Sequence, residues 1–312
     1  MEKSILINKI KPYIAYFNIC ILWGTSSLVS KIGLGDLNIS VLAFMRCMIA
    51  GFLMLAISLI FKMQFPKKLS EWKIVANISV LMNFVTIGFV AFGSKYADSG
   101  IVTLILATVP IFTTIIECFI LKIYNISIKG IIGLSVGFIG IVIILFYGSS
   151  SVKADLTGIF CALFGAITWS IGSVYSKIKP VEGPVIAQTA VEFLFASVLF
   201  FIAGNITNDF VISNITFKSL IPVFYLAIVD SFIGFTSYIY LLKIWKPSKV
   251  ATYAYINPAV ALIFGAIILG EYITTGKIIG MIIIVISVIL IQNDKTVIIN
   301  KIEELEKIDI TT

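Results

Sequence analysis

The sequence predicts an all-α integral membrane protein with ten transmembrane helices in two inverted-topology five-helix repeats, and three observations support this. Apolar residues make up 59% of the 312 residues and charged residues only 12%, whereas an ordinary soluble domain has about 25% charged residues. Apolar stretches of the length that crosses a bilayer follow one another along most of the chain. The stretch WGTSSLVSKI at 23–32 returns as WSIGSVYSKI at 169–178.

The ten predicted spans are separated by short connections that carry most of the charged residues. We expect the spans at 13–32, 39–61, 73–92, 99–121, 130–147, 156–176, 184–203, 219–241, 249–269 and 278–292. Because the basic residues cluster in these connections, the net charge of +7 does not indicate nucleic-acid binding. The apolar stretch after MEKSILINKIKP is too long for a signal peptide and lacks a small-residue cleavage site, so it is assigned to the first span.

The distribution of lysines predicts the orientation. With the N-terminus inside, seventeen lysines lie at the inner side and five at the outer side, and Arg46 lies within a span. Positive charge is retained on the cytoplasmic side of a membrane. We therefore expect a multi-pass protein of the cell (plasma) membrane with both termini in the cytoplasm.

The internal repeat extends well beyond one helix end. Trp169 follows Trp23 at an offset of 146, and the stretch from Pro258, PAVALIFGAIILGEY, aligns with the stretch from Pro110, PIFTTIIECFILKIY. Each half has five spans, an odd number, so the second half enters the membrane from the opposite side, as in many secondary transporters. The expected divisions are a cytoplasmic N-terminus at 1–12, a first repeat at 13–147, a second repeat at 156–292 and a charged cytoplasmic tail at 293–312.

Several stretches resemble one transporter family. They are the Trp-Gly of the first span, Arg46, YADSGIVTLILATVP before Pro110, and KPSKVATYAYINPAVALIFGAIILGEYIT in the second half. On these stretches the chain resembles the ten-span, EamA-type members of the drug/metabolite transporter superfamily. The first half departs from the pattern, because Lys122 and Ile123 stand where the second half has Gly270 and Glu271.

The resemblance implies a function and a place for it. It implies export or exchange of small metabolites, amino acids or organic cations, and a central cavity lined by spans one to four and six to nine. The function predicted is therefore a secondary active transporter of small polar metabolites that works by alternating access.

Ionisable residues inside the predicted spans are the first candidates for substrate binding or coupling. Each costs about 2.5–3.5 kcal/mol on insertion scales, and such residues usually face the protein interior or water. Glu117 shares one side of its helix with Thr113 and Pro110, four and seven residues earlier. It is expected to bind a cation or carry a coupling proton; the alternative is a buried structural pair.

The charges of the two repeats differ at one matched position. Arg46 and Glu192 each follow the repeated Trp by 23 residues, and Gln188 lies one turn before Glu192. They are expected to bridge the two halves in one conformational state or to share a zwitterionic substrate, with a static pair as the alternative. Asp230 is a further candidate at the middle of the eighth span, unless the span boundary leaves it near the surface.

Prolines and aromatic residues complete the candidate site. Pro110 and Pro258 lie at matched positions, Asn257 precedes the second proline, and helix breaks at equivalent positions of two repeats indicate a transport site. The alternative is a kink that serves packing alone. Four aromatic residues are expected to attract an organic cation if they line the cavity, and to pack against lipid or core otherwise: Trp23, Trp169, Tyr253 and Tyr255.

Other motifs are absent from the sequence. There is no His, the four Cys show no paired spacing, and no nucleotide-binding loop is present. We therefore expect no metal, no cofactor, no enzymatic activity and no nucleic acid as partner. The expected partners are a small-molecule substrate, the lipid bilayer and coupling protons, with no obligatory protein partner. The rival functions are a membrane receptor or regulatory subunit without transport, and a membrane-embedded lipid-modifying enzyme.

Overall fold

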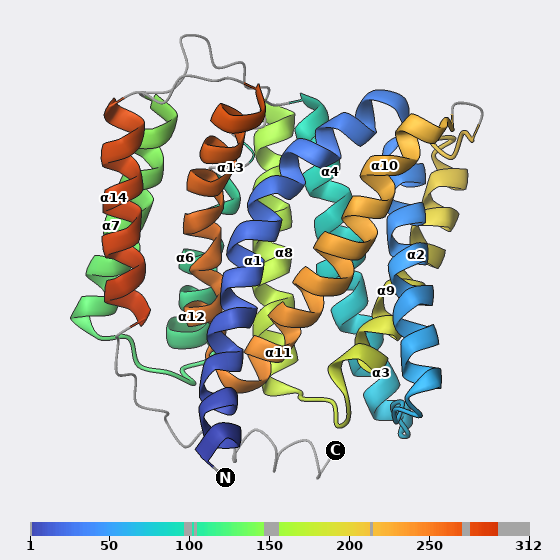
Figure 1. Cartoon of the computed structure of the whole chain (residues 1–312), viewed down its shortest axis with the longest axis horizontal. Coiled ribbons are helices and arrows are strands. Elements are labelled where there is room, and N and C mark those ends of the chain that lie inside the picture. The colour runs from blue at the N-terminus through green and yellow to red at the C-terminus, as the bar shows by residue number, and fades with distance from the viewer. Residues whose placement is uncertain are drawn as a thin grey trace.

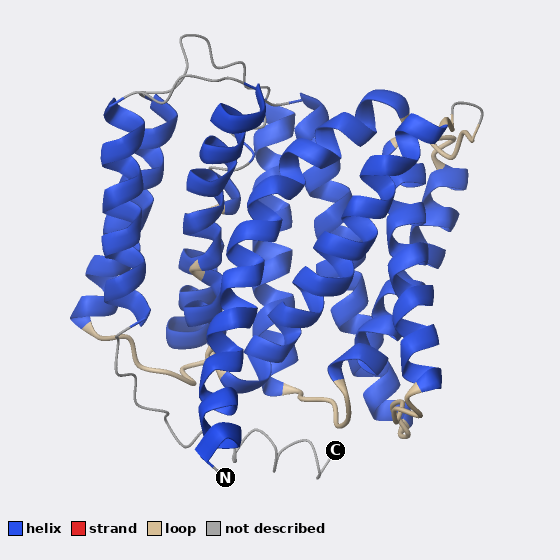
Figure 2. Cartoon of the chain, in the orientation of Figure 1, coloured by secondary structure: helices blue, strands red, loops and turns tan. Residues whose placement is uncertain are grey.

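The computed structural model describes residues 2–96, 102, 105–146, 156–212, 215–269 and 275–292. Within these residues the chain is helical with short connections and contains no β-strand (Figure 2). The predicted tail at 293–312 and the pair Gly270 and Glu271 lie outside the described residues.

The helices coincide with the predicted spans to within a few residues at most ends. They are α1 (Glu2–Asp36), α2 (Ile39–Ile60), α3 (Leu69–Ile78), η1 (Ser79–Val85), α4 (Thr86–Tyr96), α6 (Val109–Thr114), η2 (Ile115–Ile120), α7 (Ile128–Phe146), α8 (Leu156–Ile178), α9 (Val185–Ile206), α10 (Phe217–Tyr225), η3 (Leu226–Phe235), α11 (Thr236–Ile244), α12 (Pro247–Ala251), α13 (Tyr253–Leu269) and α14 (Thr275–Gln292). Figure 1 shows them running roughly from top to bottom, with α1 in front of α8 and α14 in front of α7, and with α1 and the α10–α11 segment running obliquely. The main difference is α1, which begins eleven residues before the predicted span and contains Pro12.

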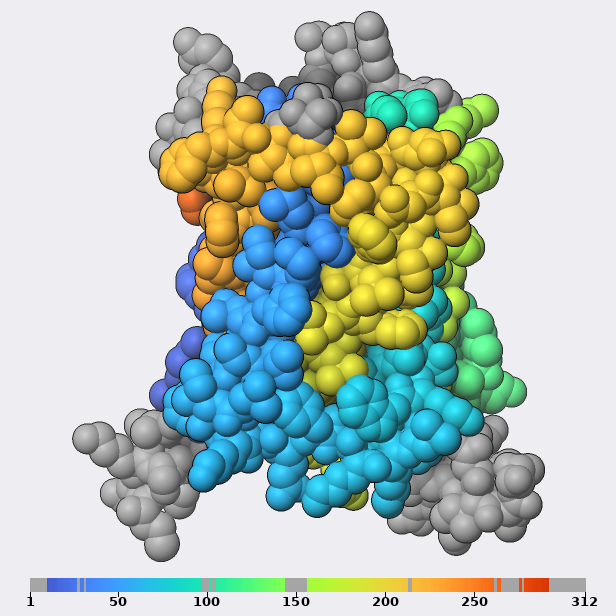
Figure 3. Space-filling view, turned by 90° about the vertical axis from the view of Figure 1, so that its right-hand side faces the viewer, coloured from blue at the N-terminus to red at the C-terminus, as the bar shows by residue number. Residues whose placement is uncertain are grey.

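Five helical segments among the described residues are long and apolar enough to cross a membrane. They are Ile39–Ile60, Leu69–Tyr96, Leu156–Ile178, Val185–Ile206 and Phe217–Ile244. Shorter apolar helices occur at Val109–Ile120, Ile128–Ile143 and Ile278–Ile291. The face formed by α2, α9, α10 and α3 is closely packed in Figure 3. Large apolar side chains such as Phe52, Phe201 and Phe224 are exposed there, as expected of a surface that contacts lipid.

Two long helical segments each contain a π-helical stretch near their middle. The first is α3–η1–α4 and the second is α10–η3–α11. A π-helical turn inserts an extra residue into a helix and is often found at functional sites. Aligning Pro110 with Pro258, an offset of 148, places η1 within η3. The same irregularity is therefore present at the same place in both halves of the chain.

The packing of the helices is also repeated. α2 packs on α9, and α7 packs on α14. α8 contacts α4 and α6, while α1 makes the matching contacts with η3, α11 and α13. α2 and α9 are antiparallel, because Gly204 lies beside Ser40 and Gly51 beside Leu194. If each helix is exchanged for its counterpart in the other half, this pattern of contacts is unchanged.

One glycine controls the closest crossing of α4 and α8. A Cβ atom on Gly93 would lie 3.0 Å from the backbone oxygen of Gly158 and 3.3 Å from the backbone nitrogen of Ala162. A Cβ on Gly88 of the same helix would meet nothing closer than the Phe200 ring at 3.5 Å. The helices can approach to this distance only because residue 93 has no side chain.

We expect Gly93→Ala to lower the thermal unfolding midpoint of the protein in detergent, whereas Gly88→Ala leaves it unchanged or raises it. Both substitutions gain up to about 1 kcal/mol of helix propensity, so the difference between them reports the backbone contact. Intrinsic tryptophan fluorescence during heating measures both midpoints. Equal midpoints would contradict the proposed role of the crossing.

Candidate functional site

A cavity of about 640 Å³ lies between the helices of the two halves. It lies in the 300–1,000 Å³ range of small-molecule sites. It is lined by residues of α1, α2, η1, α4, α8, η3 and α13. It extends from Trp23 and Trp169 in the interior to Asn38 and Lys95, which are exposed at the face opposite the N-terminal end of α1. The cavity is therefore reached from that face.

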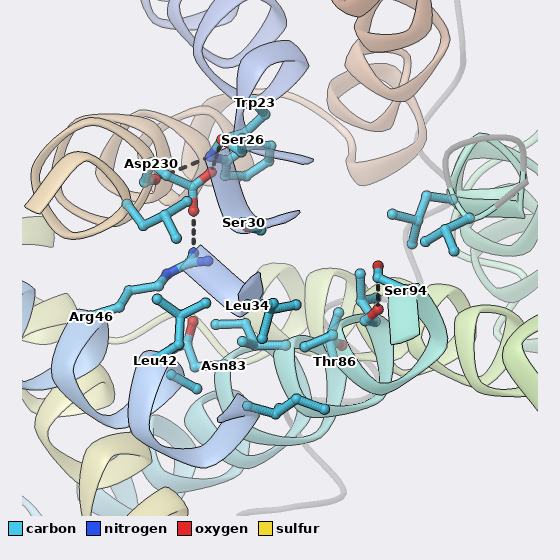
Figure 4. Close-up of a pocket in the computed structure, with 18 of the residues that line it drawn as sticks. Trp23, Ser26, Ser30, Leu34, Leu42, Arg46, Asn83, Thr86, Ser94 and Asp230 are labelled. Atoms are coloured by element: carbon cyan, nitrogen blue, oxygen red, sulfur yellow. Dashed lines mark hydrogen bonds and ion pairs between the residues drawn. The ribbon is translucent and has the colours of Figure 1, made fainter. Parts of the chain in front are cut away.

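A charged cluster forms one wall of the cavity (Figure 4). Arg46 on α2 forms an ion pair with Asp230 on η3, and its Nε donates to the hydroxyl of Ser231, 2.8 Å away. The hydroxyl of Ser26 on α1 donates to Oδ1 of Asp230 over 2.5 Å. The Trp23 indole nitrogen donates to the Asp230 backbone oxygen at 3.1 Å. The cluster joins α1 and α2, which follow one another in the sequence, to η3 in the second half of the chain.

The charges that line the cavity are balanced. Arg46 and Lys95 are basic, and Asp209 and Asp230 are acidic. The ion pair is largely buried, with side-chain exposures of 14% for Arg46 and 7% for Asp230. Asp209 lies at the mouth, where its carboxylate accepts a hydrogen bond from the backbone nitrogen of Ser40 at 3.0 Å. A solute that enters meets both signs of charge and no net excess of either.

Aromatic side chains form the inner end of the cavity. The ring centroid of Trp23 lies 5.4 Å from Trp169, 5.3 Å from Tyr238 and 4.8 Å from Tyr253. Tyr238 is fully buried behind the lining residues, and its hydroxyl shares a hydrogen bond of 2.7 Å with Ser173. The contacts with Trp169 and Tyr253 are edge-on and that with Tyr238 is tilted, and aromatic pairs at these distances add roughly 0.5–1.5 kcal/mol each to simple burial. The cluster therefore closes the cavity on the side of the N-terminus.

Further hydrogen bonds link helices on the same side of the cavity, and one of them joins the two halves of the chain. The hydroxyl groups of Tyr16 and Thr252 are 2.6 Å apart. The ammonium of Lys243 donates to the backbone oxygens of Val181 and Gly183 at 3.2 and 3.1 Å. These contacts link α1 to the start of α13, and α11 to the connection before α9. The described structure is thus open at one face and closed at the other.

The structure brings six of the sequence-predicted residues to this cavity. They are Trp23, Arg46, Trp169, Asp230, Tyr253 and Asn257. The pairing of Arg46 differs from the predicted bridge to Glu192, because Asp230 occupies that role. A carboxylate on η3 reaches Arg46 directly.

Five other predicted residues do not line the cavity. Glu117 is 1% exposed, and its carboxylate accepts a hydrogen bond from the backbone nitrogen of Ser248 at 3.1 Å. Thr113, on the same helix, donates to the carbonyl of Val109 at 2.7 Å. The structure therefore places Glu117 and Thr113 in contacts within the protein, with Glu117 joining η2 to α12.

The remaining three lie on α9 and α13. Gln188 donates to Glu192 over 3.0 Å, and both side chains are buried. Oε2 of Glu192 has no hydrogen-bond partner among the described residues. Tyr255 points away from the cavity, and its hydroxyl donates to the carbonyl of Leu134 on α7 at 3.1 Å.

The two prolines behave differently. Pro110 is the second residue of α6, directly after the turn at 107–108, so the helix is interrupted as predicted. Pro258 lies inside α13 and does not end it, and neither does Asn257. The interruption in the second half is at Thr252, between α12 and α13. At this turn the backbone nitrogen of Tyr255 donates a hydrogen bond of 3.1 Å to the carbonyl of Thr252, which is three residues earlier and not four as in an α-helix.

Ser26, Asn83 and Tyr238 are among the residues at or beside the cavity that sequence reasoning missed. Ser26 is one of several small polar residues after Trp23, and nothing in the sequence distinguishes it from its neighbours. Asn83 gives a clearer signal, since it is an amide in the middle of a mainly apolar span. Among the described residues no group of His, Cys, Asp and Glu is arranged to hold a metal ion.

The comparisons with known proteins agree with one another. The model of the EamA-like transporter family matches residues 10–146 and again residues 156–292. The chain is 31% identical to the "Uncharacterized inner membrane transporter YedA" of Escherichia coli strain K12, over 90% of each protein. It is 23% identical to the "Probable amino-acid metabolite efflux pump" of Salmonella typhimurium strain LT2, over 85% of this chain and 89% of that protein. A crystal structure with 17% identity has the same fold, with a TM-score of 0.74 over 89% of this chain and 95% of that one.

We expect Arg46→Met and Asp230→Asn each to destabilise the protein, because either change leaves a buried charge without its partner, at a cost of about 3–5 kcal/mol. The double variant should lose less than the sum of the two, with a coupling on the order of 1–3 kcal/mol. Unfolding midpoints of all four proteins in detergent measure the cycle. Glu182→Gln, an exposed acid elsewhere, is the control that should change nothing. Additive effects of Arg46→Met and Asp230→Asn would show that the pair contributes nothing to stability.

Proposed function

We propose a function that starts from the family of the chain. The chain belongs to the EamA-like transporter family, because the family model matches both of its halves. The chain is a membrane transporter, as its relatives are named and as its long apolar helices require. In more detail, we propose that it is a secondary transporter with ten spans and two halves of inverted topology. It exports or exchanges small zwitterionic metabolites, amino acids above all, by alternating access.

The repeated packing supports the inverted repeat. α2 and α9 hold matching places in the two halves and run antiparallel to each other. Helices that cross the membrane in opposite directions at matched positions are what an inverted repeat requires. The shorter helices α6–η2, α7 and α14 would complete the ten spans.

The charged wall of the cavity supports a zwitterionic substrate and carries this proposal. Arg46 uses Nε and Nη2 for its hydrogen bonds to described residues, so further N–H groups of the guanidinium can bind a carboxylate. The carboxylate of Asp230 and the faces of Trp23 and Trp169 can receive an ammonium. An amino acid presents both groups on one carbon atom. The amino-acid efflux pump among the relatives fits the same chemistry.

The buried acids away from the cavity support coupling to protons. Glu117 and Glu192 are enclosed by protein and form no ion pair with a described residue. A carboxyl group so placed is costly as an anion and can carry a proton across part of the membrane. Proton antiport through one of these acids is the proposed driving mechanism, and substrate exchange is the alternative.

We expect purified protein in proteoliposomes to move amino acids, with flux that increases when a pH gradient is imposed. Glu117→Gln and Glu192→Gln should each remove the dependence on the gradient if that acid carries the proton, and leave counterflow exchange intact. Folding is checked by the unfolding midpoint. Gradient-independent flux in the wild type would favour exchange. Absence of flux across a panel of amino acids and amines, in folded protein, would favour the receptor function.

We expect a cysteine at Lys95 to react with a membrane-impermeant thiol reagent added to intact cells, in a variant whose four native cysteines are serines. A cysteine at Lys62, in the exposed connection after α2, should react only after the membrane is permeabilised. The reverse pattern would contradict the proposed orientation, in which both termini are cytoplasmic.

A further inference from the structure

We propose that Asn83 is a specificity-determining residue of the cavity, which selects solutes carrying an uncharged group that both donates and accepts hydrogen bonds, a carboxamide or a hydroxyl. This inference rests on the proposed function, in which the charged head of the solute is held by Arg46 and Asp230. Asn83 would then bind the other end of the same molecule.

Asn83 is buried, and its side chain has no hydrogen-bond partner in the part of the chain that the structure describes. It is 1% exposed, and neither Nδ2 nor Oδ1 finds a partner among the described residues. Leaving a buried polar group unpaired is costly, and most buried side-chain polar atoms in proteins are paired. The residue lines the cavity, and Figure 4 shows its amide oxygen directed toward Leu42, on the same side as the charged cluster. Both atoms are enclosed in the described structure, so a molecule bound in the cavity would reach this donor and acceptor through a rotation of the Asn83 side chain.

The polar neighbours of Asn83 along the same segment are satisfied. Ser79, four residues before, donates to the Glu192 carbonyl at 2.5 Å. Thr86, three residues after, shares a hydrogen bond of 2.9 Å with Thr168 of α8. The packing around η1 thus supplies partners for both neighbours and not for Asn83. A side chain kept only for helix packing would have been served better by an apolar residue of the same shape, such as Leu.

The repeat places Asn83 opposite the charged cluster. At the offset of 148, Asn83 of η1 corresponds to Ser231 of η3. Ser231 accepts a hydrogen bond from Arg46 and so belongs to the charged cluster. The two π-helical stretches therefore present different chemistry to one cavity. η3 presents an ion pair, and η1 presents a neutral amide.

The chemistry of the amide limits what it can bind. A carboxamide offers N–H donors and one carbonyl acceptor, which match a group that also donates and accepts. Leu42, Ile87 and Leu106 are apolar lining residues of the cavity, and an unpaired charge placed against apolar side chains is costly. A site built around such a hydrogen bond discriminates strongly against an analogue of the same shape that lacks the group.

The test compares two pairs of amino acids of nearly equal shape, asparagine with leucine and threonine with valine. We expect the wild type to bind and transport the polar member of each pair at least about tenfold better. Binding is measured as the rise in unfolding midpoint with added solute, and transport as flux into proteoliposomes. Asn83→Leu should abolish the preference or reverse it, and Asn83→Ala serves the same purpose if Asn83→Leu does not fold. Asn77→Leu, on the exposed side of the same segment, should keep the preference.

A second readout separates this role from a structural one. Without solute, Asn83→Leu should unfold at a midpoint equal to or above that of the wild type, since it removes an unpaired buried amide. A lower midpoint with an unchanged preference would show that Asn83 is satisfied by bound water and only supports the fold, which would overturn the inference.

The remaining outcomes also test the inference about Asn83. A wild type that prefers neither polar member, or binds none of the four amino acids, would overturn the inference about Asn83. The proposed transport function would fail separately, only if the flux assay with the wider panel were also silent.

Discussion

The ion pair between Arg46 and Asp230 is the interaction on which the arrangement of the cavity depends. An unpaired charge within an apolar helix bundle is costly, so each of these residues requires the other. Ser26 and Trp23 add hydrogen bonds from α1 to the same aspartate. Three helices are thereby fixed around one carboxylate. The charge that makes the site costly to bury also makes it able to bind a charged solute.

The same scaffold carries different side chains in its two halves, and this makes the two ends of the molecule unequal. Arg46 is the eighth residue of α2, and Glu192 is the eighth residue of α9. Because the two helices are antiparallel, these residues lie about 10 Å from opposite ends of the pair, at 1.5 Å per residue. Arg46 faces the cavity, whereas Glu192 is enclosed with Gln188 in the closed half. A repeat in the backbone therefore coexists with opposite charges at matched depths.

The sequence was sufficient to predict the helices and much of the charged wall, because the cost of burying charge is a local property of each residue. Arg46 and Asp230 could be selected for this reason, and Trp23 as an aromatic residue of the internal repeat. The contact between Glu117 and Ser248 could not be predicted, since it joins residues 131 positions apart in the chain.

Two further details of the site could be determined only from the structure. Tyr253 and Tyr255 could not both face the cavity, because residues two apart on an α-helix point in nearly opposite directions, and the structure selects Tyr253. The π-helical stretches leave no mark in the hydrophobic pattern. Asn83 could therefore be seen as a polar residue in an apolar span but not placed at a cavity.

The closed end of the molecule indicates which contacts must change if the cavity is to be reached from the other face. The hydrogen bond of Tyr16 with Thr252 joins one half of the chain to the other, and that of Ser173 with Tyr238 joins α8 to α11 within the second half. Each is a single hydrogen bond, with a net contribution of only about 0.5–1.5 kcal/mol. By contrast, α2 packs on α9, and α7 on α14, along much of their lengths. Rearrangement at the closed end therefore requires little free energy per contact, whereas separation of either helix pair would expose a long packed surface. In the proposed alternating access, the two pairs would be the fixed part of the molecule, and the helices that bear the aromatic cluster would be the part that moves.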